Sequence, residues 1–373
     1  MTAEKRFSTY PFVRIANFVA FAVAFGAVFG AAGLIAPDAA AQTAKDTSAL
    51  RFSGEANVDT AYALVNPFDT EPGVSRSSLY LGATSLRLDA VGGYRDSAKV
   101  DASILTRLSY PGDDPKPSLE VKKLYLSVFT EAADLSAGRM IVNYGRGTVF
   151  SPVDLFSTVD LSETSWGRIG TDAVRVLVPF SDLSGLDLVS TLAKTPENAT
   201  AGGRLYGHFA GWDLAVSAFR DQSAFFAVDL KGDAVVGVSA EAVARVEEAG
   251  TRCRFMGGID YSLGGEWFFD LEYLANFDFG TPTRQVLFSG DHNVFASVTW
   301  APDKLTSADL RAIAGFDGGA FAALASVAVS RSVARGATLT AYARYLSGDV
   351  EGTGAASASV PSLAVGARLS VAF

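Results

Sequence analysis

The chain has 373 residues, of which 49% are hydrophobic and only 19% are charged. This balance excludes a disordered chain, which needs low hydrophobicity and high charge. The net charge of −9 argues against nucleic acid as a partner, because phosphate contacts need a basic surface. One cysteine and two histidines exclude an intrachain disulfide and multi-cysteine metal sites, and they leave little material for a histidine-based one.

The first 41 residues have the pattern of an export signal. Lys5, Arg6 and Arg14 supply positive charge, residues 18–36 are apolar or glycine, and Ala39–Ala41 are small. We therefore expect a signal peptide over residues 1–41, cleaved before Gln42, with export to the outer membrane. The alternative is an uncleaved anchor, because an apolar stretch of this length can cross a bilayer.

After residue 41, apolar and polar residues alternate with period two. In residues 50–62 every charged residue occupies an odd position. In residues 267–279 one face is aromatic and aliphatic, while the other carries Asp270 and Glu272. A helix would scatter these sets on all sides, so the pattern indicates strands.

The strands have the length and spacing of a membrane barrel. Many segments run for about 10–13 residues, enough for a tilted strand to cross a bilayer, and aromatic residues gather at their ends. The sequence predicts an all-β fold, a single closed antiparallel transmembrane β-barrel of about 16–18 strands over residues 42–373. Segment 185–194 is weakly patterned and segment 224–231 is short. The number of strands is 18 if both are strands and 16 if neither is. The longest connections are 63–76, 111–118, 145–170, 280–291 and 348–360, and the connections between them are tight turns.

Residues 138–156 read GRMIVNYGRGTVFSPVDLF. This stretch resembles a motif of porin-like outer-membrane proteins of Gram-negative type bacteria, and Phe373 resembles the terminal aromatic residue of such barrels. The resemblance implies that the loop after the fifth strand folds into the lumen and narrows it. Loop 145–170 follows the predicted fifth strand, so we expect a charged constriction formed by Arg146, Asp154, Asp160, Glu163 and Arg168. The alternatives are an ordinary external loop and a loop that packs on a neighbouring subunit.

Four further arginines fall on polar strand faces and could line an anion path, namely Arg107, Arg252, Arg254 and Arg368. The other interpretation, which we prefer, is a lumen charge network with Asp101, Asp260, Asp270 and Glu272. Cys253 lies on an apolar face and is expected to behave as a lipid-facing hydrophobe. His208 and His292 have no partner at metal-ligand spacing. We therefore predict no catalytic residue, cofactor or metal site, and no enzyme.

The expected function is passive diffusion of small hydrophilic solutes or ions through a porin-like channel. The expected partners are outer-membrane lipid and the permeating solutes, without nucleic acid, and both a trimer and a monomer remain open. Two alternatives remain, namely a non-channel surface barrel, such as an adhesin or structural protein, and a transporter of hydrophobic substrates. Small residues on the inferred lumen face favour an open channel.

Overall fold

A computed structural model describes residues 50–67, 77–94, 97–111, 115–159, 167–248, 250–278, 290–317, 320–348 and 362–373. The expected signal peptide, Asp160 and Glu163 lie outside the described residues. All strands belong to one compact unit, Thr47–Ala372. Within the described residues, no helix has the length and apolar character needed to cross a membrane.

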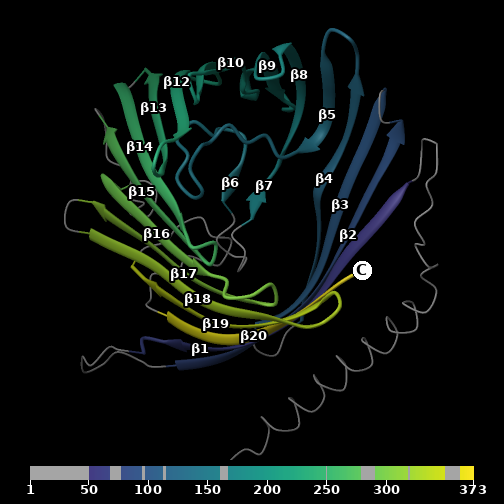
Figure 1. Cartoon of the computed structure of the whole chain (residues 1–373), viewed down its shortest axis with the longest axis vertical. Helices are drawn as coiled ribbons and strands as arrows, with labels where there is room; N and C mark the ends of the chain where they lie inside the picture. The colour runs from purple at the N-terminus through teal and green to yellow at the C-terminus, as the bar shows by residue number, and fades with distance from the viewer. Residues whose placement is uncertain are drawn as a thin grey trace, which may run out of the picture. The chain divides into compact units, whose positions relative to one another are not determined.

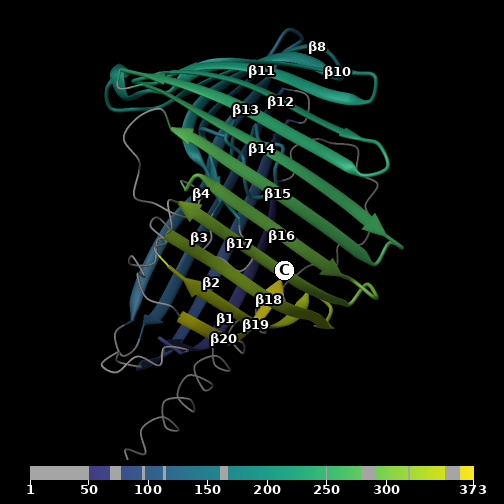
Figure 2. The same ribbon diagram turned by 90° about the vertical axis from the view of Figure 1, so that its left-hand side faces the viewer.

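Eighteen strands form one closed antiparallel sheet (Figures 1 and 2). In order they are β1 (Arg51–Val65), β2 (Ser77–Tyr94), β3 (Ala98–Pro111), β4 (Lys116–Phe129), β5 (Asp134–Met140), β8 (Thr171–Ser181), β9 (Ser184–Thr191), β10 (Ala201–Phe209), β11 (Trp212–Arg220), β12 (Ala224–Asp233), β13 (Gly237–Glu247), β14 (Gly250–Leu263), β15 (Trp267–Asp278), β16 (His292–Trp300), β17 (Thr306–Asp317), β18 (Ala320–Ala334), β19 (Ala337–Ser347) and β20 (Ser362–Ala372). A separate pair, β6 (Thr158–Val159) and β7 (Arg168–Ile169), and the short 3₁₀-helix η1 (Pro196–Asn198) lie in connections.

The sheet closes because β1 pairs on one side with β2 and on the other with β20. The closing register runs from Glu55 opposite Ala372 to Val65 opposite Ser362. Closure leaves no strand edge, which a membrane requires because hydrocarbon offers no partner for an exposed backbone N–H or C=O. The predicted all-β barrel is confirmed, and the strand number is 18 rather than 16.

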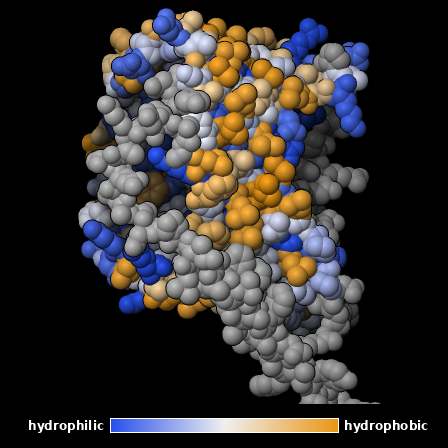
Figure 3. Space-filling model, turned by 90° about the vertical axis from the view of Figure 1, so that its right-hand side faces the viewer, coloured by the Kyte–Doolittle hydropathy of each residue, from blue (hydrophilic) through white to orange (hydrophobic). Residues whose placement is uncertain are grey.

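The period-two pattern of the sequence corresponds to the two faces of the barrel wall. On β15, Leu271 and Tyr273 face outward and are 46% and 45% exposed, whereas Asp270 and Glu272 face inward and are buried. Neighbours in register share a face, so the alternation continues around the wall. Hydrophobic residues gather across the middle of the side shown in Figure 3, with hydrophilic ones mainly toward its ends.

One expected strand ends early. The pattern predicts residues 134–144, but β5 ends at Met140 and the chain then leaves the wall. Two glycines make the following turn possible. An added Cβ would lie 1.9 Å from the Ser151 Oγ at Gly145 and 2.0 Å from the Phe150 carbonyl oxygen at Gly147. The connection therefore runs from 141 to 170 rather than from 145.

Candidate functional site: the inward loop

The connection between β5 and β8, residues 141–170, is called the inward loop here. Its pair β6 and β7 lies inside the ring of strands in Figure 1. The described parts, 141–159 and 167–170, pack with inward-facing side chains of the wall from β8 to β18. This loop therefore occupies part of the lumen.

Two apolar clusters fix the inward loop to the wall. In the first, Val149 and Phe150 pack against inward side chains of β14 to β18 (Met256, Leu274, Phe295, Ile313, Ala322 and Leu324). In the second, Val142, Tyr144, Val153 and Phe156 pack against Met140, Ala173, Val189, Phe219, Phe225, Ala227 and Val243. The inner wall is thus apolar where these two clusters lie, and burial of both surfaces favours the docked loop.

Glu272 on β15 binds the backbone of the inward loop. Its carboxylate accepts hydrogen bonds from the N–H groups of Thr148, Val149 and Phe150, with 2.7 Å from Phe150 N to Oε2. The Glu272 side chain is among the most completely buried in the described structure. Its charge is compensated by three amide dipoles instead of a cation.

Glu241 on β13 binds the same loop on both sides of the Glu272 contacts. It accepts from the Arg146 N–H at 2.5 Å, from the Val153 N–H at 3.0 Å and from the Ser151 hydroxyl at 3.1 Å. Together the two glutamates hold segment 146–153. A loop inside a barrel cannot pair its amides with strands, so these carboxylates satisfy donors that would otherwise be buried without a partner.

Arg146 lies at the start of this segment, where it joins a buried charge cluster. Its Nε lies 2.6 Å from Asp229 Oδ1, and the same oxygen accepts from Arg204 at 2.7 Å. Arg204 also donates to the Tyr144 carbonyl oxygen at 2.6 Å. The Asp229 side chain is fully buried, whereas Arg146 remains 18% exposed.

Asp154 and Arg168 join the two arms of the inward loop. Arg168 NH1 lies 2.5 Å from Asp154 Oδ2, and the Asp154 side chain is only 1% exposed. Asp154 also accepts from the Ser157 hydroxyl and from the N–H of Phe156. Burial raises the pKa of Asp154, and the bonds from Ser157 and the charge of Arg168 oppose that rise. Asp154 thus lies within the loop, not on its surface.

The other predicted lumen residues face inward. Arg107 lies on the inner face of β3, and Arg252 and Arg254 lie on that of β14. Arg252 Nε is 3.5 Å from Glu247. The network expected between these arginines and acidic residues that include Glu272 stays a prediction, and the contacts seen at Glu272 are those to the loop amides. Asp260 lies 4.0 Å from Lys231, and Asp101 lies 3.3 Å from Lys99.

The inner wall opposite carries its own polar networks. Arg368 NH2 on β20 lies 2.6 Å from Asp59 on β1, and Tyr342 donates to the same carboxylate. On β2, Arg87 lies 3.1 Å from Glu55 and 3.0 Å from Asp89. These pairs leave most charges of this wall balanced locally.

The histidines and the cysteine have local partners or outward positions. His208 Nδ1 lies 2.8 Å from Asp213, and His292 lies 2.7 Å from the Tyr273 hydroxyl on the outward face. Cys253 is a free thiol on the outward face of β14. Among the described residues, no group of three or more His, Cys, Asp or Glu side chains could hold a metal ion.

Comparison with known proteins identifies the architecture. No protein-family model matches the chain, and neither does any curated protein. Solved structures do match. Pseudomonas aeruginosa OpdK with vanillate has a TM-score of 0.56 at 11% identity, covering 86% of this chain and 98% of that one. The fold is that of porin-like outer-membrane barrels.

Two further porin structures agree over a similar extent. Acinetobacter baumannii OccAB4 has a TM-score of 0.55 at 10% identity, covering 86% of this chain and 98% of that one. Pseudomonas aeruginosa OccK11 (OpdR) has a TM-score of 0.54 at 10% identity and covers 86% and 96%. At these identities the likeness concerns the porin-like fold alone.

Proposed function

We propose that the protein is an outer-membrane channel for the passive diffusion of small hydrophilic solutes or ions. The observation that carries the proposal is the inward loop, which is docked inside a closed barrel by Glu241, Glu272 and two apolar clusters. Barrels of 16–18 strands are wide enough for an aqueous path. A loop fixed in such a lumen narrows that path.

We further propose that charges of the inward loop set the ion preference at its narrowest point. Arg146 and Arg168 keep 18% and 16% of their side chains exposed. Low-dielectric walls focus the field at a constriction, so each permeating ion passes close to these charges. Asp160 and Glu163 belong to the same proposal, whereas the buried Asp154 acts through its bond to Arg168.

The proposed path to the membrane is export by a signal peptide over residues 1–41, followed by insertion of residues 42–373. The apolar stretch and the Ala39–Ala41 site support it, as does the outer-membrane location of the solved structure of opdK. Outer-membrane lipid and the permeating solutes are the proposed partners.

A planar bilayer recording tests the channel. We expect discrete conductance steps from the wild-type protein. Deletion of 150–165 should give larger steps, because it removes part of the loop that narrows the path. The barrel should still fold, because this segment takes no part in the barrel pairing. Arg146→Gln should move the reversal potential in a salt gradient toward cations. A protein that inserts as a folded barrel yet conducts nothing would refute the channel and favour a surface barrel. Unchanged conductance after the deletion would refute only the constriction.

A further inference from the structure

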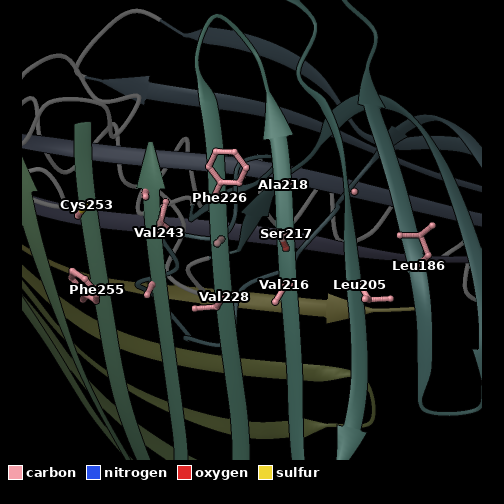
Figure 4. A pocket seen from close by; sticks show the side chains of 14 residues that line it. Leu186, Leu205, Val216, Ser217, Ala218, Phe226, Val228, Val243, Cys253 and Phe255 are labelled. Carbon is pink, nitrogen blue, oxygen red and sulfur yellow. The ribbon is translucent and has the colours of Figure 1, made fainter. Parts of the chain in front are cut away.

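An apolar groove runs along the outward face of the barrel over β10 to β14. Its floor is made of small side chains on β13, Ala240, Ala242 and Ala244, flanked by Val228 and Phe255. Two overlapping hollows of about 720 and 760 Å³ compose it. Figure 4 shows the labelled side chains on neighbouring strands, including Leu205, Val216, Phe226 and Phe255.

The register places these residues in parallel rows across the wall. Gly203, Ala218, Phe226, Ala244 and Cys253 form one row. The stretch from Ala240 to Ala244 extends for about 13 Å along the strand, at roughly 3.3 Å per residue. The groove is therefore long and narrow, on the face that meets hydrocarbon in a membrane barrel.

A cation lies two residues beyond the groove residue Ala218 on β11. Arg220 ends β11 and faces outward, in the row that continues through Ala224 and Val246 to Thr251. Arg220 is exposed, and no hydrogen bond or ion pair joins it to any other described residue. Because β11 runs in the same direction as β1 and β5, Arg220 lies at the barrel end that bears the connections 66–76 and 141–170.

We propose that this groove binds a lipid with an anionic phosphate headgroup, one acyl chain lying over Ala240–Ala244 and the phosphate held by Arg220. The apolar floor matches an alkyl chain, and a guanidinium at the membrane interface pairs with a phosphate by two parallel N–H bonds. The Thr251 hydroxyl, in the same row, is a second donor at the height of the headgroup.

The charges of the outward face favour lipid over a second copy of this chain. A partner subunit would have to offer a carboxylate to Arg220. The outward carboxylate of Asp172 already lies 2.8 Å from Arg139 in a two-bonded pair. Ala224 and Val246, the row neighbours of Arg220, carry no charge.

Native mass spectrometry of the full barrel in detergent tests the proposal, with phosphatidylglycerol and phosphatidylcholine of equal chain length as probes. We expect the wild type to retain phosphatidylglycerol preferentially. Arg220→Gln should reduce that preference about fivefold, the factor equivalent to roughly 1 kcal/mol per basic residue at an anionic membrane surface. Ala244→Phe fills the groove and should reduce retention of both lipids. Arg331→Gln, which changes an outward arginine on β18 at the opposite end, is the matched control and should change neither.

The proposal is overturned if the wild type shows no preference, if Arg220→Gln keeps it, or if Ala244→Phe retains both lipids as the wild type does. All of these residues face outward, so unchanged channel conductance verifies that each variant is folded. Conductance reports the channel and mass spectrometry reports lipid retention, so failure of one proposal can be distinguished from failure of the other.

Discussion

At the scale of single residues, Glu241 and Glu272 act as receptors for a backbone segment. Each lies on the inner wall with apolar neighbours, and each accepts several bonds from residues about 90–120 positions earlier in the chain. Hydrogen bonds to a charged acceptor contribute about 1.5–3 kcal/mol each. The pair therefore determines where the inward loop rests.

Replacing Glu272 should loosen the inward loop without unfolding the barrel. In Glu272→Ala the buried N–H groups of Thr148, Val149 and Phe150 lose their acceptor, at a cost of about 1–3 kcal/mol per group left unpaired. We expect stronger fluctuations of the open-channel current in bilayer recordings. Glu55→Ala, which removes an inward carboxylate bonded to Arg87 on the far wall, should leave the current as steady as in the wild type. Equal noise in the two variants would contradict the assigned role.

The Asp154–Arg168 pair predicts a non-additive double mutant. Arg168→Gln leaves the nearly buried Asp154 carboxylate without its cation, and breaking such a pair costs about 3–5 kcal/mol. Arg168→Gln combined with Asp154→Asn removes both charges and should be closer to the wild type. The rate at which an added protease cleaves the inward loop measures how firmly the loop is docked, and it should be higher in the single variant than in the double variant.

The pH dependence of this pair has a definite sign. Burial raises the pKa of Asp154, so the docked loop binds the proton more tightly than a released loop does. As the pH falls through the raised pKa, the carboxyl becomes neutral and the gap between the single and double variants should close. A gap that widens in acid would refute the assignment.

At the scale of elements, the period-two pattern indicated the wall strands with ends that differ by a few residues, and it left two weak segments undecided, 185–194 and 224–231, which form β9 and β12. It indicated the strands because each strand has one face toward lipid and one toward the lumen, so apolar and polar residues alternate along it. The inward loop was predicted only by resemblance. Its anchors could not be found from spacing, because Glu241 and Glu272 bind amides of residues distant in sequence. A usable signal existed in Met256, Leu274 and Phe295, which are apolar on the lumen face and mark the covered wall.

The wall assignment predicts opposite outcomes for neighbouring residues of β18. Val327 faces outward and is 44% exposed, so Val327→Arg should cost about 2–4 kcal/mol in hydrocarbon near the middle of the bilayer. Ala328 faces inward, opposite Asp309 and Tyr342, so Ala328→Arg should cost much less. Denaturant titration of both variants refolded in lipid vesicles measures the two free energies of unfolding. Similar values would contradict the facing of this strand.

At the scale of the whole molecule, we propose that a short leader over residues 1–41 precedes the barrel. The leader should be absent from the mature form, since the small residues Ala39–Ala41 follow the apolar stretch. N-terminal sequencing of protein extracted from membranes should begin at Gln42. A chain that still begins at Met1 would support the uncleaved anchor instead.

The pairing of β1 with β20 also constrains how the chain assembles. Glu55 and Ala372 stand more than 300 residues apart in sequence yet lie side by side in the finished wall. Such contacts carry a high loop-closure entropy and form slowly. Until the barrel closes, the first and last strands each have an unpaired backbone edge that can pair with another chain. The seam joining the two termini is therefore the step at which synthesis, protection from aggregation and membrane insertion have to be coordinated in time.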